Sequence, residues 1–257
     1  MYSRRQSQGR VGLLDEVRGF CIVLMVLYHG AFDLIYIFGI DIPAFHWPIL
    51  HFAQPFVAGI FIFLSGIACR YSHSNLKRGV IALALGLVMS GVTIYFMRDL
   101  AIYFGILHLL GSSMILYALL QRALDKLPAL GGLLLFALLC LLTWGVPSHY
   151  VGIPGLLTWP LPASLYTVPY LFPLGFTASG FSSADYFPLL PWLFLFLSGS
   201  YMGVFFKRSS MPGFFYREHS RILAWIGRRS LIIYLLHQPV VYGILYAVFA
   251  VKQYFLG

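Results

Sequence analysis

Two ionisable residues, His29 and Asp33, stand inside the first long apolar stretch of the sequence. Ionisable groups inside a membrane span are costly and usually functional. The Asp33 carboxylate would lie one helical turn from His29, where it can orient and charge the imidazole as a general base requires. Arg18 precedes His29 by eleven residues, close to three full turns, so one helix face would carry all three side chains. This helix is the first candidate for catalysis.

Two further histidines, His108 and His237, stand in other apolar stretches. If helices begin near residues 101 and 230, a rise of about 1.5 Å per residue places each imidazole about 10 Å from the nearer membrane surface. Asp185 precedes another apolar stretch, at its predicted outer end. Together with the first helix, these residues could line one polar tunnel.

Each of these residues also has a purely structural interpretation. His108 and His237 could hydrogen-bond a neighbouring helix and hold the bundle together. Asp33 could simply satisfy His29, and Asp185 could cap the helix that follows the turn at Pro188. The interpretation as a functional residue is strongest for His29, because a carboxylate one turn away suits a base.

The elements that would position these residues are membrane-spanning helices. Hydrophobic residues make up 60% of the chain and charged residues 10%, and the mean hydropathy is +0.84. Such a composition cannot coat a soluble globule. Stretches of about 18 to 23 nearly uncharged residues can cross roughly 30 Å of hydrocarbon. They occur near 19–38, 52–69, 79–97, 101–120, 129–146, 188–206 and 230–251. The sequence therefore predicts an all-α polytopic membrane bundle of seven helices, forming a single domain over 1–257.

The basic residues predict the orientation of this bundle, because Lys and Arg collect on cytoplasmic loops. A cytoplasmic N-terminus and an extracytoplasmic C-terminus leave only Arg98 and Lys252 of the basic residues between 4 and 252 on the outer side. The same bias accounts for the net charge of +9 without a nucleic-acid partner, since no nucleic-acid motif is present. Three scattered cysteines lack disulfide or metal-ligand spacing, and we predict no metal.

The segment 147–187 interrupts the pattern, because it is rich in proline, glycine, serine and tyrosine. Prolines at this density break helices. The segment could form an extracytoplasmic cap, a re-entrant hairpin, or an extra pair of short helices, and a re-entrant piece would need protein or water to satisfy its backbone.

Four separated motifs resemble a known family. They are Asp15-x-x-Arg18-Gly19 followed by His29, Phe104-Gly105-Ile106-Leu107-His108, Ser183-Ala184-Asp185-Tyr186-Phe187-Pro188-Leu189-Leu190-Pro191-Trp192, and Gly227-Arg228-Arg229-Ser230-Leu231-Ile232-Ile233-Tyr234-Leu235-Leu236-His237-Gln238-Pro239. The first is similar to the start of integral-membrane acyltransferases that modify sugars. The set resembles the bacterial members of the heparan-α-glucosaminide N-acetyltransferase catalytic-domain family, which implies a bacterial inner (plasma) membrane protein.

The resemblance implies transfer of an acetyl group from cytoplasmic acetyl-CoA to an amino or hydroxyl group of a sugar or glycan, such as a glucosamine unit, on the far side. His29 would take the acceptor proton, or would itself carry the acetyl group in a ping-pong reaction. His108, His237, Gln238 or Tyr28 could donate hydrogen bonds to the oxyanion.

His46 is a second catalytic candidate. The lysosomal member of the family has an asparagine at the position of His29, and its proposed active histidine lies in a region similar to that of His46. The alternative is an ordinary interfacial histidine beside Trp47.

The resemblance also implies binding residues. Arg18, Arg70, Arg228 and Arg229 could hold the phosphates of coenzyme A, although the positive-inside rule alone places basic residues there. For Arg18 the other interpretation is a structural pair with Asp15.

On the outer side, Asp185, Tyr186 and Trp192 could bind the acceptor sugar, although interfacial belts collect aromatic residues regardless of substrate. A proton-coupled transporter of a small solute would also place His and Asp inside the membrane, but no two segments are interrupted at matching positions. The sequence leaves a homodimer open.

Overall fold

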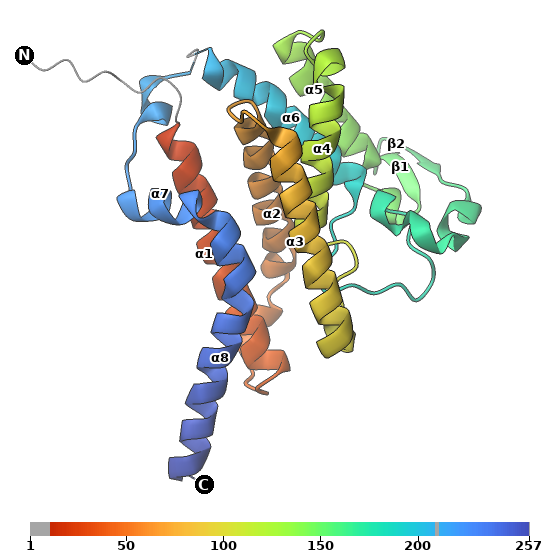
Figure 1. Cartoon of the computed structure of the whole chain (residues 1–257). Coiled ribbons are helices and arrows are strands. Elements are labelled where there is room, and N and C mark those ends of the chain that lie inside the picture. The colour runs from red at the N-terminus through yellow and green to blue at the C-terminus, as the bar shows by residue number, and fades with distance from the viewer. Residues whose placement is uncertain (1–10, 209–210, 257) are drawn as a thin grey trace, which may run out of the picture. The chain divides into compact units, whose positions relative to one another are not determined.

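The computed structural model describes residues 11–208 and 211–256, and these fall into two compact units (Figure 1). Of the described residues, the first unit comprises 11–61 and 211–256, and the second comprises 62–208. The helix α2 (Pro48–Cys69) begins in the first unit and ends in the second.

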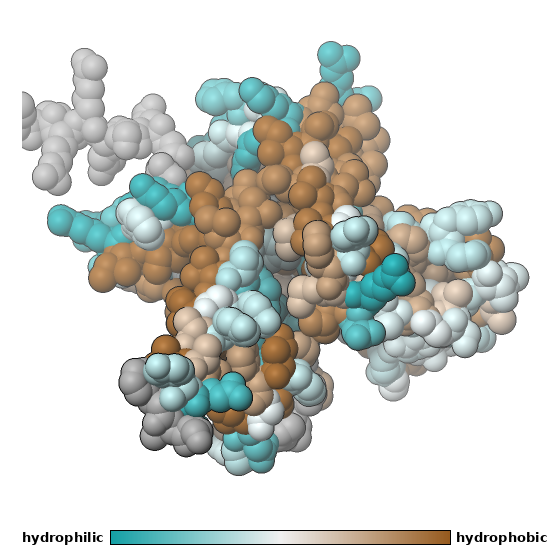
Figure 2. Space-filling view, turned by 60° about the horizontal axis from the view of Figure 1, so that its bottom comes forward, coloured by the Kyte–Doolittle hydropathy of each residue, from teal (hydrophilic) through white to brown (hydrophobic). Residues whose placement is uncertain are grey.

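Seven helices among the described residues are long and apolar enough to cross a membrane, as the sequence predicts. They are α1 (Gly12–Tyr36), α2, α3 (Asn75–Phe96), α4 (Ile106–Leu124), α5 (Ala129–Thr143), α6 (Leu189–Lys207) and α8 (Ser230–Leu256). Large apolar side chains such as Phe20, Leu87 and Leu134 are exposed on these helices, and brown apolar surface covers much of the face in Figure 2. The chain is a multi-pass membrane protein.

In the first unit, α1 packs against α8 and against the short helix α7 (Arg221–Arg228). Glycines allow α1 and α7 to approach closely. A Cβ atom on Gly227 would lie 1.8 Å from the backbone oxygen of Asp15, and one on Gly19 would lie 2.0 Å from that of Leu223. Glu16 accepts hydrogen bonds from the backbone N–H groups of His219 and Ser220 at the start of α7. The motif around residues 15–19 therefore positions α7.

In the second unit, α3 packs against α4, and α5 packs against α6. The part of α2 in this unit meets α6 through glycines. A Cβ atom on Gly66 would lie 2.0 Å from the backbone oxygen of Phe196, and one on Gly199 would lie 2.1 Å from that of Phe63. Small residues at helix contacts are typical of membrane bundles, where close backbone approach replaces the hydrophobic effect.

The fourth spanning helix begins at Ile106, five residues after the predicted start. Residues 101–105 are drawn into an extended segment by residues 184–187. Backbone N–H groups of Ala184 and Phe187 donate to the carbonyls of Ala101 and Phe104, at 3.1 and 2.9 Å. The first helix begins earlier than predicted, at Gly12, because its charged first turns pack on the protein itself.

The proline-rich segment contains a two-stranded hairpin and 3₁₀ turns in place of additional α-helices. The strands β1 (Tyr150–Ile153) and β2 (Leu157–Pro160) are antiparallel. The 3₁₀ turns are η3 (Val146–Ser148), η4 (Ala163–Thr167) and η5 (Pro169–Leu174). Figure 1 shows this segment as the green region after α5.

Candidate active site

The first unit brings two of the predicted histidines together. His29 lies on α1 and His237 on α8, and their ring centroids are 4.9 Å apart at an interplanar angle of 60°. Asp33, one turn after His29, is fully buried, and it accepts a hydrogen bond from the side-chain amide of Gln238. We call His29, Asp33, His237 and Gln238 the histidine site.

Backbone carbonyls fix the tautomer of both imidazoles. His29 Nδ1 lies 3.0 Å from the carbonyl oxygen of Met25, and His237 Nδ1 lies 2.6 Å from that of Tyr234. A carbonyl oxygen only accepts hydrogen bonds, so in each neutral ring Nδ1 carries the hydrogen. Nε2 of each ring therefore has the lone pair that a general base needs.

Asp33 does not hydrogen-bond His29, contrary to the predicted triad-like arrangement. Gln238 Nε2 donates to both carboxylate oxygens of Asp33, at 2.8 and 3.0 Å. The imidazole instead bonds the carbonyl of Met25, four residues before it on the same helix, because that acceptor is within reach of a histidine side chain. Asp33 is thus a positioning residue for Gln238.

The site has unused acceptor atoms among its described residues. His237 Nε2 and Gln238 Oε1 are buried and have no hydrogen-bond partner. The orientation of the Gln238 amide is fixed, because a carboxylate only accepts and so must face the NH₂ group. Buried acceptors without donors are costly, so this arrangement favours a ligand that supplies N–H or O–H groups.

The predicted oxyanion donors are already engaged. The Gln238 amide donates to Asp33, Nδ1 of His237 donates to Tyr234, and the Tyr28 hydroxyl donates to Gln54 Oε1 at 3.4 Å. Protonation of a histidine Nε2 would add a further donor for an oxyanion. The neutral site is suited to taking protons.

His108 belongs to the second unit and is a helix-capping residue there. It is only 3% exposed, its Nδ1 accepts the backbone N–H of Gly105 at 3.2 Å, and its Nε2 lies 3.2 Å from Ser90 Oγ. Both ring nitrogens are thereby engaged at the first turn of α4. The sequence did not single out Ser90, although a serine within an apolar helix is a recognisable signal.

Asp185 caps the start of α4, whereas the sequence offered a cap for the following helix as one interpretation. Its Oδ2 accepts the backbone N–H of Ile106 at 3.0 Å, where a carboxylate stabilises the positive end of a helix. A Cβ atom on Gly105 would lie 2.2 Å from Asp185 Oδ2, which explains the glycine in the motif before His108.

The two aromatic residues predicted to bind the acceptor, Tyr186 and Trp192, pack within the second unit. The Tyr186 hydroxyl donates to the carbonyl of Phe172 at 2.7 Å, and burial raises the pKa of this phenol above its usual value. Trp192 is buried against Trp144, with ring centroids 5.1 Å apart. These contacts give both rings a structural place in the unit.

The predicted phosphate-binding arginines differ in how they are engaged. Arg18 lies 3.6 Å from Asp15, so the pair that the sequence offered as an alternative exists. Arg228 bonds Glu218 at 2.9 Å, and the guanidinium of Arg229 lies 4.3 Å from the ring centroid of Trp225.

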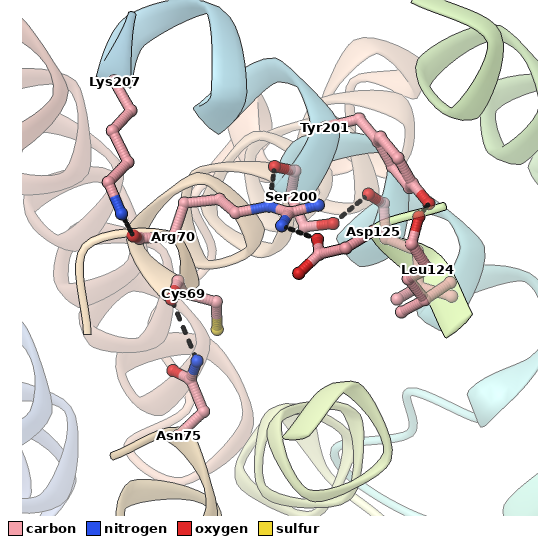
Figure 3. A network of polar contacts seen from close by, with 9 residues as sticks. Cys69, Arg70, Asn75, Leu124, Asp125, Ser200, Tyr201 and Lys207 are labelled. Carbon is pink, nitrogen blue, oxygen red and sulfur yellow. Dashed lines mark hydrogen bonds and ion pairs between the residues drawn. The ribbon is translucent and has the colours of Figure 1, made fainter. Parts of the chain in front are cut away.

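Arg70 is the most fully engaged of these arginines (Figure 3). Its Nε donates to the carbonyl of Ser200 at 3.0 Å, and its guanidinium pairs with Asp125. The same guanidinium lies 5.4 Å from the ring centroids of Tyr117 and Tyr201. Arg70 thus ties the end of α2 to α4 and α6.

His46 ends the 3₁₀ turn η1 (Pro43–His46), and its side chain lies outside the described part of the structure. The preceding Phe45 packs on Tyr28, with ring centroids 5.2 Å apart. The described residues contain no group of His, Cys, Asp or Glu side chains that could hold a metal ion.

The sequence of the chain matches one protein-family model. The family model described as heparan-alpha-glucosaminide N-acetyltransferase, catalytic, matches residues 10–239, nearly the whole chain. No curated protein and no solved structure matches the chain.

Proposed function

Because the chain belongs to the family of heparan-alpha-glucosaminide N-acetyltransferase catalytic domains, we propose that it is a membrane acetyltransferase that uses acetyl-CoA. The acetyl group would pass from the cytoplasmic side to an amino or hydroxyl group of a sugar or glycan on the opposite side. The observation that carries this proposal is the contact of the His29 and His237 rings beside two buried acceptors, His237 Nε2 and Gln238 Oε1, that have no hydrogen-bond partner among the described residues.

This arrangement can perform the two proton transfers that acyl transfer requires. The acceptor amine or hydroxyl places its hydrogen on His29 Nε2 or His237 Nε2 as its nitrogen or oxygen attacks the thioester carbonyl. The new C–N or C–O bond forms, the C–S bond breaks, and the protonated histidine returns the proton to the leaving thiolate of coenzyme A. Gln238 Oε1 would hold a second hydrogen of an amine, and Asp33 keeps that amide in place.

An acetylated histidine is the other route, with Nε2 of His29 as the nucleophile. The Nδ1 hydrogen bond to Met25 leaves Nε2 as the nucleophilic atom in either route. His46 stays a candidate base on the segment next to Tyr28.

The donor side is the cytoplasmic end. Seven crossings would put the residues before α1 and after α8 on opposite sides, and the basic residues favour a cytoplasmic start of α1 in a bacterial inner membrane. Arg229 is the proposed phosphate ligand for coenzyme A, because the guanidinium groups of Arg18, Arg70 and Arg228 already have carboxylate partners. Metal ions have no part in the proposal.

The test is transfer of labelled acetyl from acetyl-CoA to amino sugars and oligosaccharides by protein in lipid nanodiscs. We expect transfer by the wild type, and at least a ~100-fold lower kcat for His29→Ala, because a general base contributes about 10²–10⁴-fold. The matched control is His73→Ala, since His73 is exposed in the turn between α2 and α3.

Two outcomes would contradict the proposal. Full turnover by a folded His29→Ala protein would remove His29 from the reaction and leave His237 and His46 as the candidates. A wild type that neither binds nor consumes acetyl-CoA would favour proton-coupled solute transport through the histidine site.

A further inference from the structure

The second unit contains a pocket of about 570 Å³ that the histidine site does not use. Its walls come from two segments that are far apart in sequence, 98–103 and 169–182. The lining residues are Arg98, Asp99, Ala101, Tyr103, Pro169, Phe172, Gly180, Phe181 and Ser182.

Backbone hydrogen bonds hold the pocket walls together. The N–H of Tyr103 donates to Ser183 Oγ at 3.2 Å, and Ser183 Oγ donates to the carbonyl of Asp185 at 2.8 Å. A parallel bridge joins Phe104 to Tyr186 just beyond the pocket. These contacts fix the two segments within the fold itself, and a fixed cavity lowers the entropic cost of binding.

An aromatic cluster forms one side of the pocket. The rings of Phe172 and Phe181 stack with centroids 5.4 Å apart, and Tyr103 lies 5.9 Å from Phe181 and 6.4 Å from Phe172. The hydroxyl of Tyr186 donates to the carbonyl of Phe172 and so fixes the backbone that carries this ring. Such a cluster offers a rigid apolar surface to a flat ligand.

The polar groups of the pocket come from the 3₁₀ turn η2 (Arg98–Leu100), in which an arginine and an aspartate are adjacent. Both Arg98 and Asp99 are exposed, and neither side chain has an ion pair or hydrogen bond among the described residues. Planar guanidinium and carboxylate groups can each make two parallel hydrogen bonds to neighbouring groups on a ligand. The pocket therefore combines aromatic faces with unused bidentate polar groups.

We propose that this pocket binds a pyranose unit of the acceptor glycan, and this inference rests on the proposed function. The apolar C–H face of the sugar would lie on the aromatic cluster, and Asp99 and Arg98 would bind its hydroxyl groups. Ligand pockets typically combine apolar walls with a few placed polar groups in this way, and 570 Å³ accommodates a sugar unit. Arg98 is also one of the two basic residues that the charge pattern assigns to the acceptor side.

The test measures glycan binding directly, by ligand-observed NMR on protein in nanodiscs without acetyl-CoA, with neutral, amino and acidic oligosaccharides as probes. Arg98→Ala and Asp99→Asn should each weaken binding about tenfold or more, because each removes hydrogen bonds to a charged group. Ser182→Trp adds an indole at the pocket wall and should abolish binding without removing a charge. Arg122→Ala, an exposed arginine in the last turn of α4, is the matched control.

Kinetics give the second readout. The three pocket variants should raise the KM for the glycan about tenfold while the KM for acetyl-CoA stays unchanged. Thermal unfolding of each variant checks that it folds.

The two proposals fail in different ways. Folded pocket variants that bind and use glycans like the wild type would overturn the pocket assignment and leave the acetyltransferase intact. A wild type that binds none of the oligosaccharides would also overturn it. Glycan binding that the pocket variants lose, without any acetyl transfer, would support the pocket and contradict the proposed function.

Discussion

The imidazoles of His29 and His237 lie with ring centroids 4.9 Å apart, and each donates its Nδ1 hydrogen to a carbonyl of its own helix. Two bases with the same tautomer are thereby fixed side by side, one on α1 and one on α8. Each helix supplies the acceptor that fixes its own ring, so the pair depends on the contact between α1 and α8 only for its proximity.

The two histidines should act as one unit in catalysis. His237→Ala should lower kcat about 100-fold, as we expect for His29→Ala, because the proton is shared between neighbouring rings. The double variant should then be little worse than either single variant, since residues that act together have non-additive effects. Single-turnover kinetics with acetyl-CoA and saturating acceptor measures all three. Multiplicative losses would instead mean that the histidines act independently.

Asp33→Ala should destabilise the first unit through Gln238. The substitution leaves the Gln238 amide without its acceptor in a buried site, which costs about 1–3 kcal/mol in the free energy of unfolding. Chemical unfolding in mixed micelles measures the change, with Asp99→Ala as a control because that carboxylate is exposed. An unchanged unfolding free energy would show that the Asp33–Gln238 contact carries no net stability.

Part of the histidine site could be predicted from the sequence. His29 and Asp33 fall on one face by helical spacing alone, and His237 stood out as an ionisable residue in an apolar stretch. Their hydrogen-bond partners were not accessible, because the competition between Asp33 and the Met25 carbonyl for His29 depends on where Gln238 of a distant helix lies. The contact of Asp185 with α4 could not be predicted for a similar reason, since its partner, the N–H of Ile106, is 79 residues away.

The seven helices were predictable because apolar length is a property of each segment alone. The start of α4 was not, since Ala101 and Phe104 are held extended by hydrogen bonds from Ala184 and Phe187. Local propensity contains no information on that pairing.

Arg70 should be a structural residue more than a coenzyme A ligand. Arg70→Ala removes the contacts to Asp125 and Ser200, and it should lower the free energy of unfolding by about 2 kcal/mol, a value reduced because Asp125 is 45% exposed. The KM for acetyl-CoA should be unchanged. Arg78→Ala, at an exposed position of α3, is the control. An increased KM with unchanged stability would return Arg70 to the donor site.

Gly227→Ala should separate α7 from α1. The added methyl would lie 1.8 Å from the backbone oxygen of Asp15, which cannot move without displacing α1, so we expect a loss of more than about 2 kcal/mol or a failure to fold. Gly243 on α8 has no atom within 4 Å of its Cβ position, so Gly243→Ala should be neutral or stabilising by up to about 1 kcal/mol. Thermal unfolding of the pair measures the difference, and equal melting temperatures would contradict the close contact of α1 and α7.

Tyr186 should make stability depend on alkaline pH. Burial raises the pKa of its phenol, with a smaller contribution from Tyr166. Its contribution to stability is therefore complete below the unfolded pKa of about 10 and is lost as the pH rises toward the folded value, because the unfolded state releases its proton first. The unfolding free energy of the wild type should fall more steeply above about pH 10 than that of Tyr186→Phe. Tyr170→Phe should behave like the wild type, since Tyr170 is 76% exposed. Parallel pH profiles for wild type and Tyr186→Phe would show that this phenol titrates equally in the folded and unfolded chain.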